Sequence, residues 1–171
     1  WELRHMMLTA KEYQRGPFSI RFPRGKGSRI EWSCEMKIME IGKGRQVVEG
    51  SDIAILGIGA VGKDILEAIS HIGNKNSMPS FYDLRFLKPI DEELIKLIFG
   101  RYQKIITVED GTLVGGLASA ISELKIKYNY QGKIKCLGIP DQFIEHGKPE
   151  ELKALCGYDS KGILSCVQSF Y

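Results

Sequence analysis

The chain has 171 residues and a mass of 19.2 kDa, the size of one large domain or of one domain with an appendage. Hydrophobic residues make up 43% and charged residues 26%, a balance that excludes disorder, collagen and coiled coil as descriptions of the whole. The formal net charge is only +3, so the sequence predicts no nucleic-acid partner. The longest mostly apolar run, Ile53 to Val61, is about half of a membrane span, so no membrane partner is predicted either.

The four cysteines form neither a CxxC pair nor a metal-like spacing with histidine; they are Cys34, Cys136, Cys156 and Cys166. Disulfides are rare in reducing compartments, and zinc sites need closely spaced ligand pairs. We therefore expect four free thiols in a cytoplasmic protein. From the polar start of the chain, with Glu2, Arg4 and His5, we expect no signal peptide.

The first fifty residues combine one regular segment with an irregular one. Leu3, Met6, Met7 and Ala10 have helical spacing and predict a helix over residues 1–14, which Gly16-Pro17 should end. Residues 18–22 alternate apolar and polar side chains, which predicts a strand. The rest is less regular, with a loop at 23–27 and a hairpin or a pair of linker strands within 36–48.

From Ser51 onward, apolar runs typical of strands alternate with helical patterns. Strands are predicted at 53–56, 81–86, 104–108 and 134–137, and helices at 62–73, 89–102, 114–128, 148–156 and 159–170. Asp91 is the expected cap of the second of these helices. The alternation predicts a three-layer α/β fold, an open and mostly parallel sheet with helices on both faces.

The most conspicuous motif is Gly57-Ile58-Gly59-Ala60-Val61-Gly62, which fits G-x-G-x-x-G between a strand and a helix. With Asp83 about 20 residues further on, it has the layout of an NAD(P)-binding Rossmann module. The alternative is a tight strand-to-helix turn that needs glycines for its own geometry. Two points weaken the dinucleotide interpretation: the strand of Asp83 is predicted to continue through Phe86, and no His or Tyr–Lys pair is placed for hydride transfer.

Several segments, in order along the chain, carry a more specific pattern. They are Phe22-Pro23-Arg24-Gly25, Ile41-Gly42-Lys43-Gly44, Leu84-Arg85-Phe86-Leu87-Lys88-Pro89-Ile90-Asp91, Ile106-Thr107-Val108-Glu109-Asp110 with Gly115-Gly116, and Leu137-Gly138-Ile139-Pro140-Asp141-Gln142-Phe143-Ile144-Glu145-His146-Gly147. They resemble the Y-P-R-G, P-I-G-K-G, R-F-V-K-P-L-D, T-V-E-E and L-G-I-P-D-x-F-I-E-H-G motifs of the 1-deoxy-D-xylulose-5-phosphate synthase family. The resemblance runs from Trp1 to about Gly162.

This resemblance implies a division of the chain. Residues 1–27 would be the end of a pyrimidine-binding domain, 28–50 a linker, and 51–171 a transketolase C-terminal-like domain. The family's enzymes are homodimeric transferases that use thiamine diphosphate and magnesium. They condense pyruvate with glyceraldehyde 3-phosphate, with loss of carbon dioxide, to 1-deoxy-D-xylulose 5-phosphate for isoprenoid, thiamine and pyridoxal phosphate synthesis.

The segments that carry this chemistry in the family have no counterpart here. The chain contains no Gly-Asp-Gly for the metal and diphosphate and almost nothing of the pyrimidine-binding domain, and its three histidines lie elsewhere in the pattern. We therefore expect the isolated chain to bind no cofactor and to be inactive, serving dimerisation and active-site support. A third interpretation is a stand-alone structural or regulatory domain that binds only a partner.

One substrate-binding residue carries over. Arg24, in the P-R-G motif, matches the arginine that the family uses to grip the substrate phosphate, and a guanidinium suits that role. Phe22 stands where the family usually has tyrosine. Glu109, Asp110 and Gly115-Gly116 are interpreted as a strand end packed on a helix N-terminus rather than as substrate contacts, and His146 as a packing or dimer-contact residue.

Overall fold

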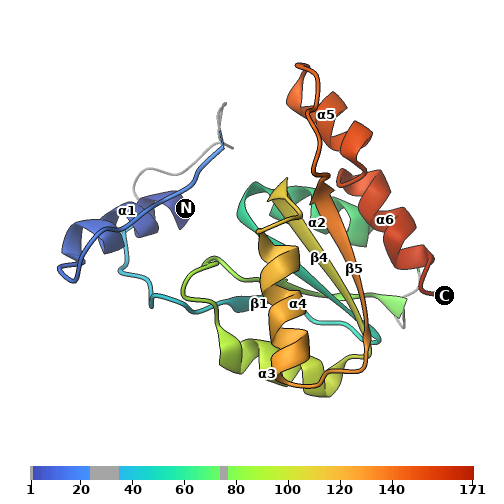
Figure 1. Ribbon diagram of the computed structural model, residues 1–171, viewed down its shortest axis with the longest axis horizontal. Helices are drawn as coiled ribbons and strands as arrows, with labels where there is room; N and C mark the ends of the chain where they lie inside the picture. The colour runs from blue at the N-terminus through green and yellow to red at the C-terminus, as the bar shows by residue number, and fades with distance from the viewer. Residues whose placement is uncertain (1, 24–34, 74–76) are drawn as a thin grey trace. The chain divides into compact units, whose positions relative to one another are not determined.

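The computed structural model describes residues 2–23, 35–73 and 77–171 and divides into two compact units, residues 1–41 and 42–171 (Figure 1). In the first unit, helix α1 spans Glu2–Glu12. Residues 35–40 run beside it, because the Lys37 amide donates to His5 Nδ1 at 3.0 Å and the Met39 amide donates to Thr9 Oγ1 at 2.8 Å. His5 and Thr9 are one helical turn apart, so two side chains of α1 hold alternate amides of an extended segment.

Two predictions for this part of the chain are wrong. Residues 18–22 are not a strand, and residues 36–41 are not half of a hairpin. A strand requires a neighbour that pairs its amides and carbonyls, and the described residues supply none to either segment. Amides of the second segment bind α1 instead.

The second unit is built on a five-stranded sheet with the order β1-β3-β2-β4-β5. Its strands are β1 (Arg45–Val48), β2 (Ile53–Ile58), β3 (Ser80–Asp83), β4 (Lys104–Thr112) and β5 (Lys133–Ile139). The last four are parallel to one another, and β1 joins the edge of β3 in the antiparallel sense. The compact unit begins at Gly42, and its edge strand β1 lies within residues 28–50, the segment predicted as a linker.

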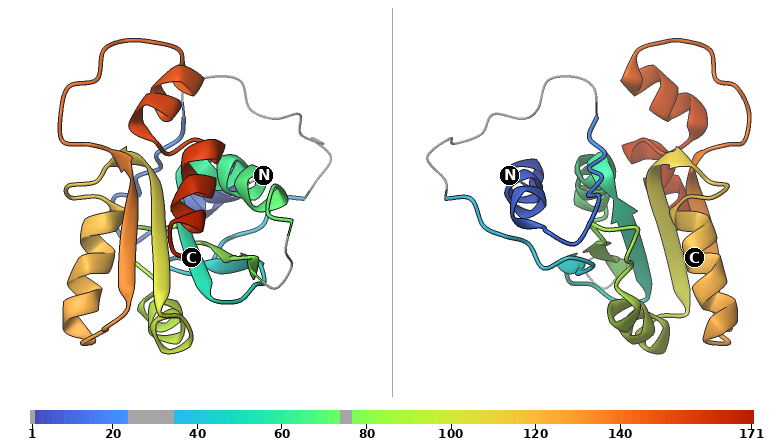
Figure 2. Two further views of the ribbon diagram at one scale, coloured as in Figure 1. Left: turned by 90° about the vertical axis from the view of Figure 1, so that its right-hand side faces the viewer. Right: turned by 60° about the vertical axis from the view of Figure 1, so that its left-hand side comes forward.

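Helices cover both faces of this sheet, as predicted. Helices α3 (Glu92–Arg101) and α4 (Leu117–Lys127) pack on one face, and α2 (Gly62–Ser70) and α6 (Ser160–Gln168) pack on the other (Figure 2). Along β2, Ala54 and Leu56 join the first core, while Ile53 and Ile55 join the second. All four are completely buried, as expected for a strand inside a three-layer fold.

The remaining elements position the edge of the sheet where the parallel strands end. A 3₁₀ turn, η1 (Gly59–Val61), leads from β2 into α2, and helix α5 (Pro149–Cys156) follows the loop after β5. Asp91 caps α3 as expected, accepting from the Leu94 amide at 3.1 Å, and it also accepts from the Gly44 amide at 3.1 Å.

Among the described residues, no helix combines the length and the apolar character that a membrane-spanning helix needs.

Candidate functional site

The carboxyl ends of the parallel strands are the usual place for a ligand in an open α/β sheet. Here the turn after β2 carries the glycine motif, and the end of β4 carries Glu109 and Asp110. Helices α5 and α6 approach the same edge from the end of β5 (Figure 1). The contacts of these residues distinguish a dinucleotide-binding site from a structural strand-to-helix junction.

Glu109 closes the N-terminus of α4. Its side chain is buried, and its two oxygens accept from the backbone amides of Leu117 and Ala118 at 2.8 and 2.9 Å. A carboxylate at a helix N-terminus satisfies amides that the helix cannot pair and complements the helix dipole. A Cβ on Gly116 would lie 2.0 Å from Glu109 Oε2, so only glycine leaves room for this contact. The geometry matches the packing role expected for Glu109 and Gly116.

Asp110 and Asp64 connect the C-terminal helices to the body of the domain. The Tyr158 hydroxyl, just before α6, donates to Asp110 Oδ1 at 2.9 Å. Burial above all, and then the Asp110 carboxylate, raises the pKa of Tyr158 above its ordinary value. Lys153 on α5 forms a 2.7 Å ion pair with Asp64 in the first turn of α2. The sequence analysis missed both contacts, since they join residues 48 and 89 positions apart.

The glycines of the motif have structural reasons of their own. A Cβ on Gly57 would lie 2.7 Å from Ile65 Cδ1 and 2.9 Å from Phe81 Cε2. Gly59 has a φ of +80°, in the left-handed region that favours glycine. Asp64 already places a negative charge in the first turn of α2, where a dinucleotide would bring its pyrophosphate. The turn therefore has the form of a strand-to-helix junction rather than of a phosphate cradle.

One argument against a dinucleotide proves wrong. Strand β3 ends at Asp83 and does not continue through Phe86, because Arg85 turns the chain with a φ of +57°. Asp83 thus stands at a strand end, where a ribose-binding acid would be. Its carboxylate instead accepts from Arg45 on β1 at 3.4 Å and from the Arg85 amide at 3.2 Å, contacts that fasten the edge of the sheet.

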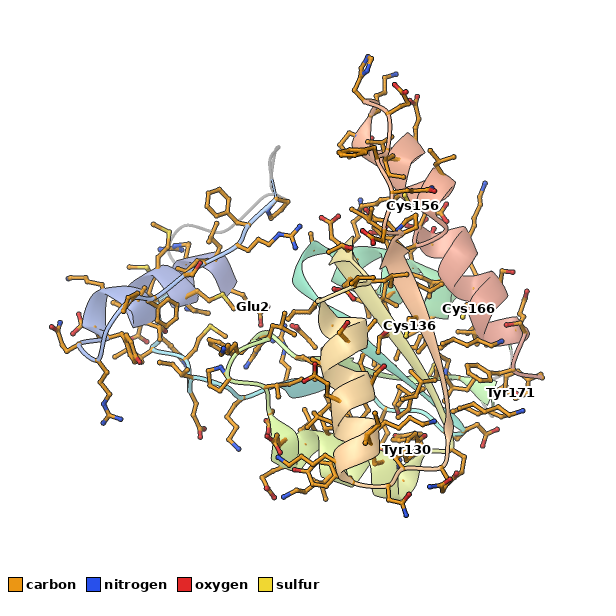
Figure 3. All side chains as sticks on the ribbon, in the orientation of Figure 1. Glu2, Tyr130, Cys136, Cys156, Cys166 and Tyr171 are labelled. Carbon is orange, nitrogen blue, oxygen red and sulfur yellow. The ribbon has the colours of Figure 1, made fainter. Side chains whose placement is uncertain are left out.

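The structure describes only some of the remaining candidate residues. Arg24, Gly25 and Cys34 lie outside the described residues. His146 is exposed in the loop after β5. Cys136, Cys156 and Cys166 are free thiols on β5, α5 and α6 (Figure 3).

The described residues also do not fit a thiamine diphosphate and magnesium site. None of them forms a group of three or more His, Cys, Asp or Glu side chains that could hold a metal ion. The acids at the carboxyl edge are engaged within the fold, with Glu109 on the amides of α4 and Asp64 on Lys153.

The order of the strands and the helices on both faces define an open, mostly parallel α/β domain. The family described as "Transketolase, C-terminal domain" matches residues 42–163, and the chain belongs to it. The match begins where the second compact unit begins.

Curated relatives give a finer likeness. The chain is 46% identical to the 1-deoxy-D-xylulose-5-phosphate synthase of Phocaeicola vulgatus, over 99% of this chain and 27% of the relative. It is 45% identical to the synthase of Cytophaga hutchinsonii, over 98% of this chain and 27% of the relative. The match is to a C-terminal portion of these synthases, so the chain spans about a quarter of their length.

Solved structures agree with the fold. A split-gene transketolase, described as an inactive β4 tetramer, superposes with a TM-score of 0.70 at 28% identity, over 77% of this chain and 43% of that one. The transketolase of Campylobacter jejuni superposes with a TM-score of 0.53 at 17% identity, over 75% and 18% of the two chains. The second likeness concerns the fold alone. Together these findings do not favour the dinucleotide-binding interpretation.

Proposed function

We propose that this chain serves as the C-terminal portion of a cytoplasmic 1-deoxy-D-xylulose-5-phosphate synthase that condenses pyruvate with glyceraldehyde 3-phosphate. The observation that carries the proposal is 46% identity across 99% of the chain with one such synthase. Residues 1–27 would end the preceding pyrimidine-binding domain, and thiamine diphosphate and magnesium would be held by the remainder of the enzyme. The chain by itself is then inactive and supports dimerisation and the active site from outside.

A chimera tests the proposal. The matching C-terminal segment of the Phocaeicola vulgatus synthase is replaced by this chain, and formation of 1-deoxy-D-xylulose 5-phosphate and carbon dioxide is measured. We expect an active chimera and no activity from the isolated chain. An inactive chimera that is folded and binds thiamine diphosphate would contradict the proposal. The same chimera carrying Glu123→Gln, a change on the exposed side of α4, is the matched control and should retain activity.

Within this enzyme, Arg24 is proposed to grip the phosphate of glyceraldehyde 3-phosphate. Losing a charge-assisted pair costs about 1.5–3 kcal/mol, so Arg24→Met in the chimera should lower kcat/KM for this substrate by roughly 10- to 100-fold. With unphosphorylated glyceraldehyde, kcat/KM should change little. Arg21→Met, a change of the same kind three residues away, is the control. Equal losses with both substrates would assign Arg24 a structural role instead.

Self-association is the second part of the proposal. The split-gene transketolase that resembles this chain is described as an inactive tetramer of one subunit type, which supports assembly without the remainder of a transketolase. We expect the isolated chain to form a dimer or a larger oligomer in light scattering at concentrations of about 100 µM, a range in which weak homo-oligomers assemble. A monomer under these conditions would show that dimerisation needs the rest of the synthase.

A further inference from the structure

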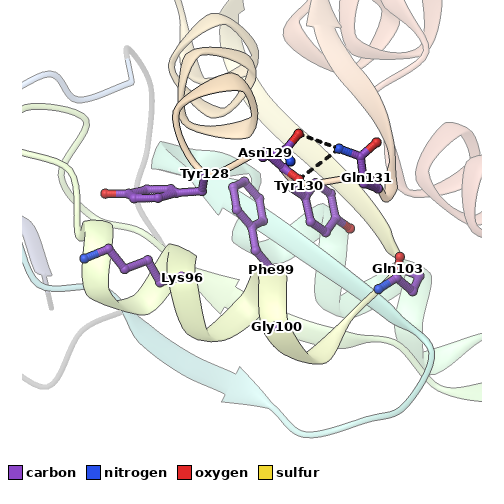
Figure 4. Close-up of a pocket in the computed structure, with 8 residues that line it drawn as sticks. All are labelled: Lys96, Phe99, Gly100, Gln103, Tyr128, Asn129, Tyr130 and Gln131. Carbon is purple, nitrogen blue, oxygen red and sulfur yellow. Dashed lines mark hydrogen bonds between the residues drawn. The ribbon is translucent and has the colours of Figure 1, made fainter.

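An open pocket lies at the opposite edge of the sheet, where β4 and β5 begin. It has a volume of about 380 Å³, and its walls are the outer side of α3 and residues 128–131, the turn that follows α4 (Figure 4). Pockets of about 300–1,000 Å³ commonly hold small ligands. None of the contacts described at the carboxyl edge involves these residues, so the pocket is independent of the proposed synthase function.

The aromatic walls of the pocket are fixed in place. Phe99 and Tyr130 stack with ring centroids 4.3 Å apart and planes 11° apart, and the Tyr130 hydroxyl donates to the Tyr102 carbonyl at 2.9 Å. The Tyr128 hydroxyl donates to Glu92. The ammonium groups of Lys96 and Lys127 both lie 5.3 Å from the centre of the Tyr128 ring. A ligand would therefore meet aromatic rings that are already positioned, which lowers the entropic cost of binding.

Gly100 keeps the floor of the pocket open. It is the last residue but one of helix α3. Neither packing nor backbone conformation requires glycine here, because a Cβ at this position would meet nothing within 4 Å and the residue has no positive φ. A side chain there would project into the space between α3 and the turn. Without a side chain at Gly100, this side of the pocket stays open.

The charge of the pocket indicates its ligand. Lys96 is the only charged side chain among the described residues that line it, and carboxamides of Gln103, Asn129 and Gln131 form the polar rim. Lys96 pairs with Glu93 at 2.7 Å, with side chains 45% and 73% exposed, and an exposed pair of this kind exchanges readily for another anion. We propose that the pocket binds a small aromatic molecule that carries a phosphate or carboxylate, with its ring against Tyr128 and Phe99 and its anionic group on Lys96.

Titration of the isolated chain with phenyl phosphate tests this proposal by amide NMR. We expect saturable shifts confined to residues 96–103 and 128–131. Inorganic phosphate and phenol, which each supply half of the ligand, should bind at least about fivefold more weakly. Benzoate in the same titration separates a preference for phosphate from a general affinity for aromatic anions. The absence of saturable shifts at these residues, or equal binding of inorganic phosphate, would overturn the proposal.

Two variants locate the site. Gly100→Leu fills the floor and Lys96→Gln removes the cation, and each should weaken phenyl phosphate binding about five- to tenfold, the value of one partly exposed contact. Lys63→Gln, which removes an exposed lysine from α2 on the other face of the sheet, should leave binding unchanged. Leucine is a good helix former, so the Gly100 variant should fold normally. Unchanged binding in both variants would show that phenyl phosphate does not occupy this pocket.

Discussion

The junction from β2 into α2 and the junction from β4 into α4 lie at the same edge of the sheet and begin a helix in different ways. The first uses three glycines and a 3₁₀ turn, and its N-cap residue, Val61, makes no side-chain hydrogen bond to the helix. The second uses the buried carboxylate of Glu109, which accepts two amides of the helix. The glycine motif at residues 57–62 therefore reflects the geometry of a tight turn. At the second junction, the Glu109 carboxylate occupies the helix N-terminus, where an anionic ligand could otherwise bind.

The largest expected difference between the two junctions is in the free energy of unfolding after alanine substitution of Gly116 or Gly62, the last glycine of each junction. In Gly116→Ala, the new Cβ would lie 2.0 Å from Glu109 Oε2 and 2.3 Å from the Thr112 carbonyl oxygen, so the backbone must move. We expect a loss of about 3 kcal/mol or more in the free energy of unfolding. In Gly62→Ala, the Cβ would meet Phe81 Cζ at 3.7 Å, an ordinary contact, and the change should be within about 0.5 kcal/mol. Urea unfolding of both variants measures the difference, and equal losses would contradict this account of the junctions.

A smaller effect is expected from the cap itself. Glu109→Gln keeps the size of the side chain but turns one acceptor into an NH₂ group, which faces an amide hydrogen of α4. A buried donor left without a partner costs about 1–3 kcal/mol, and we expect a loss in that range. Glu123→Gln, on the exposed side of the same helix, should change the free energy of unfolding by less than about 0.5 kcal/mol. A Glu109 variant as stable as this control would show that the cap contributes nothing.

The layered α/β fold was predictable because the period of apolar residues changes clearly between strand and helix. Residues 53–56 are a continuous apolar run, and residues 104–108 contain Ile105, Ile106 and Val108. Both segments form central parallel strands. The edge strand β1 was not predictable, since Arg45–Val48 has no buried residue and is held in the sheet by its pairing with β3. The strand predicted at residues 18–22 is wrong for the opposite reason: the alternating pattern is present, but a pattern does not show whether a partner strand is available.

The candidate site was less predictable than the fold. The glycine spacing and Glu109 were visible in the sequence, but their roles depend on which atoms the fold brings to them. Tyr158 and Lys153 gave no local signal, since a lysine within a helix is usually exposed and a tyrosine is as often half-buried as buried. The hydrogen bonds from the Lys37 and Met39 amides to His5 and Thr9 also gave no signal in the sequence.

At the same edge of the sheet, the hydrogen bond from Tyr158 to Asp110 should make part of the stability depend on alkaline pH. Burial and the Asp110 carboxylate raise the pKa of Tyr158 in the folded chain, so this residue contributes stability fully below its unfolded pKa of about 10 and loses it as pH rises further. At pH 7, Tyr158→Phe should lower the free energy of unfolding by about 1–2 kcal/mol, the value of a hydrogen bond to a charged group. The deficit should shrink between about pH 9.5 and 11.

Urea unfolding of both proteins at neutral and alkaline pH measures this deficit. Burial also raises the pKa of Tyr130 to about 12, but this residue is the same in both proteins and its contribution cancels. A deficit that stays constant with pH would mean that Tyr158 acts through packing alone.

The smallest expected effect concerns the ion pair that ties α5 to the first turn of α2. The side chains of Lys153 and Asp64 are 22% and 17% exposed, so their pair is less screened than one at the surface. Lys153→Met should cost about 1 kcal/mol, with part of the loss recovered in the double variant with Asp64→Asn. The control is Lys148→Met, because Lys148 and Glu151 are 3.9 Å apart and 80% and 68% exposed, and its loss should be near zero. Additive losses in the Lys153 and Asp64 double-mutant cycle would show that α5 is held by its apolar contacts and not by this pair.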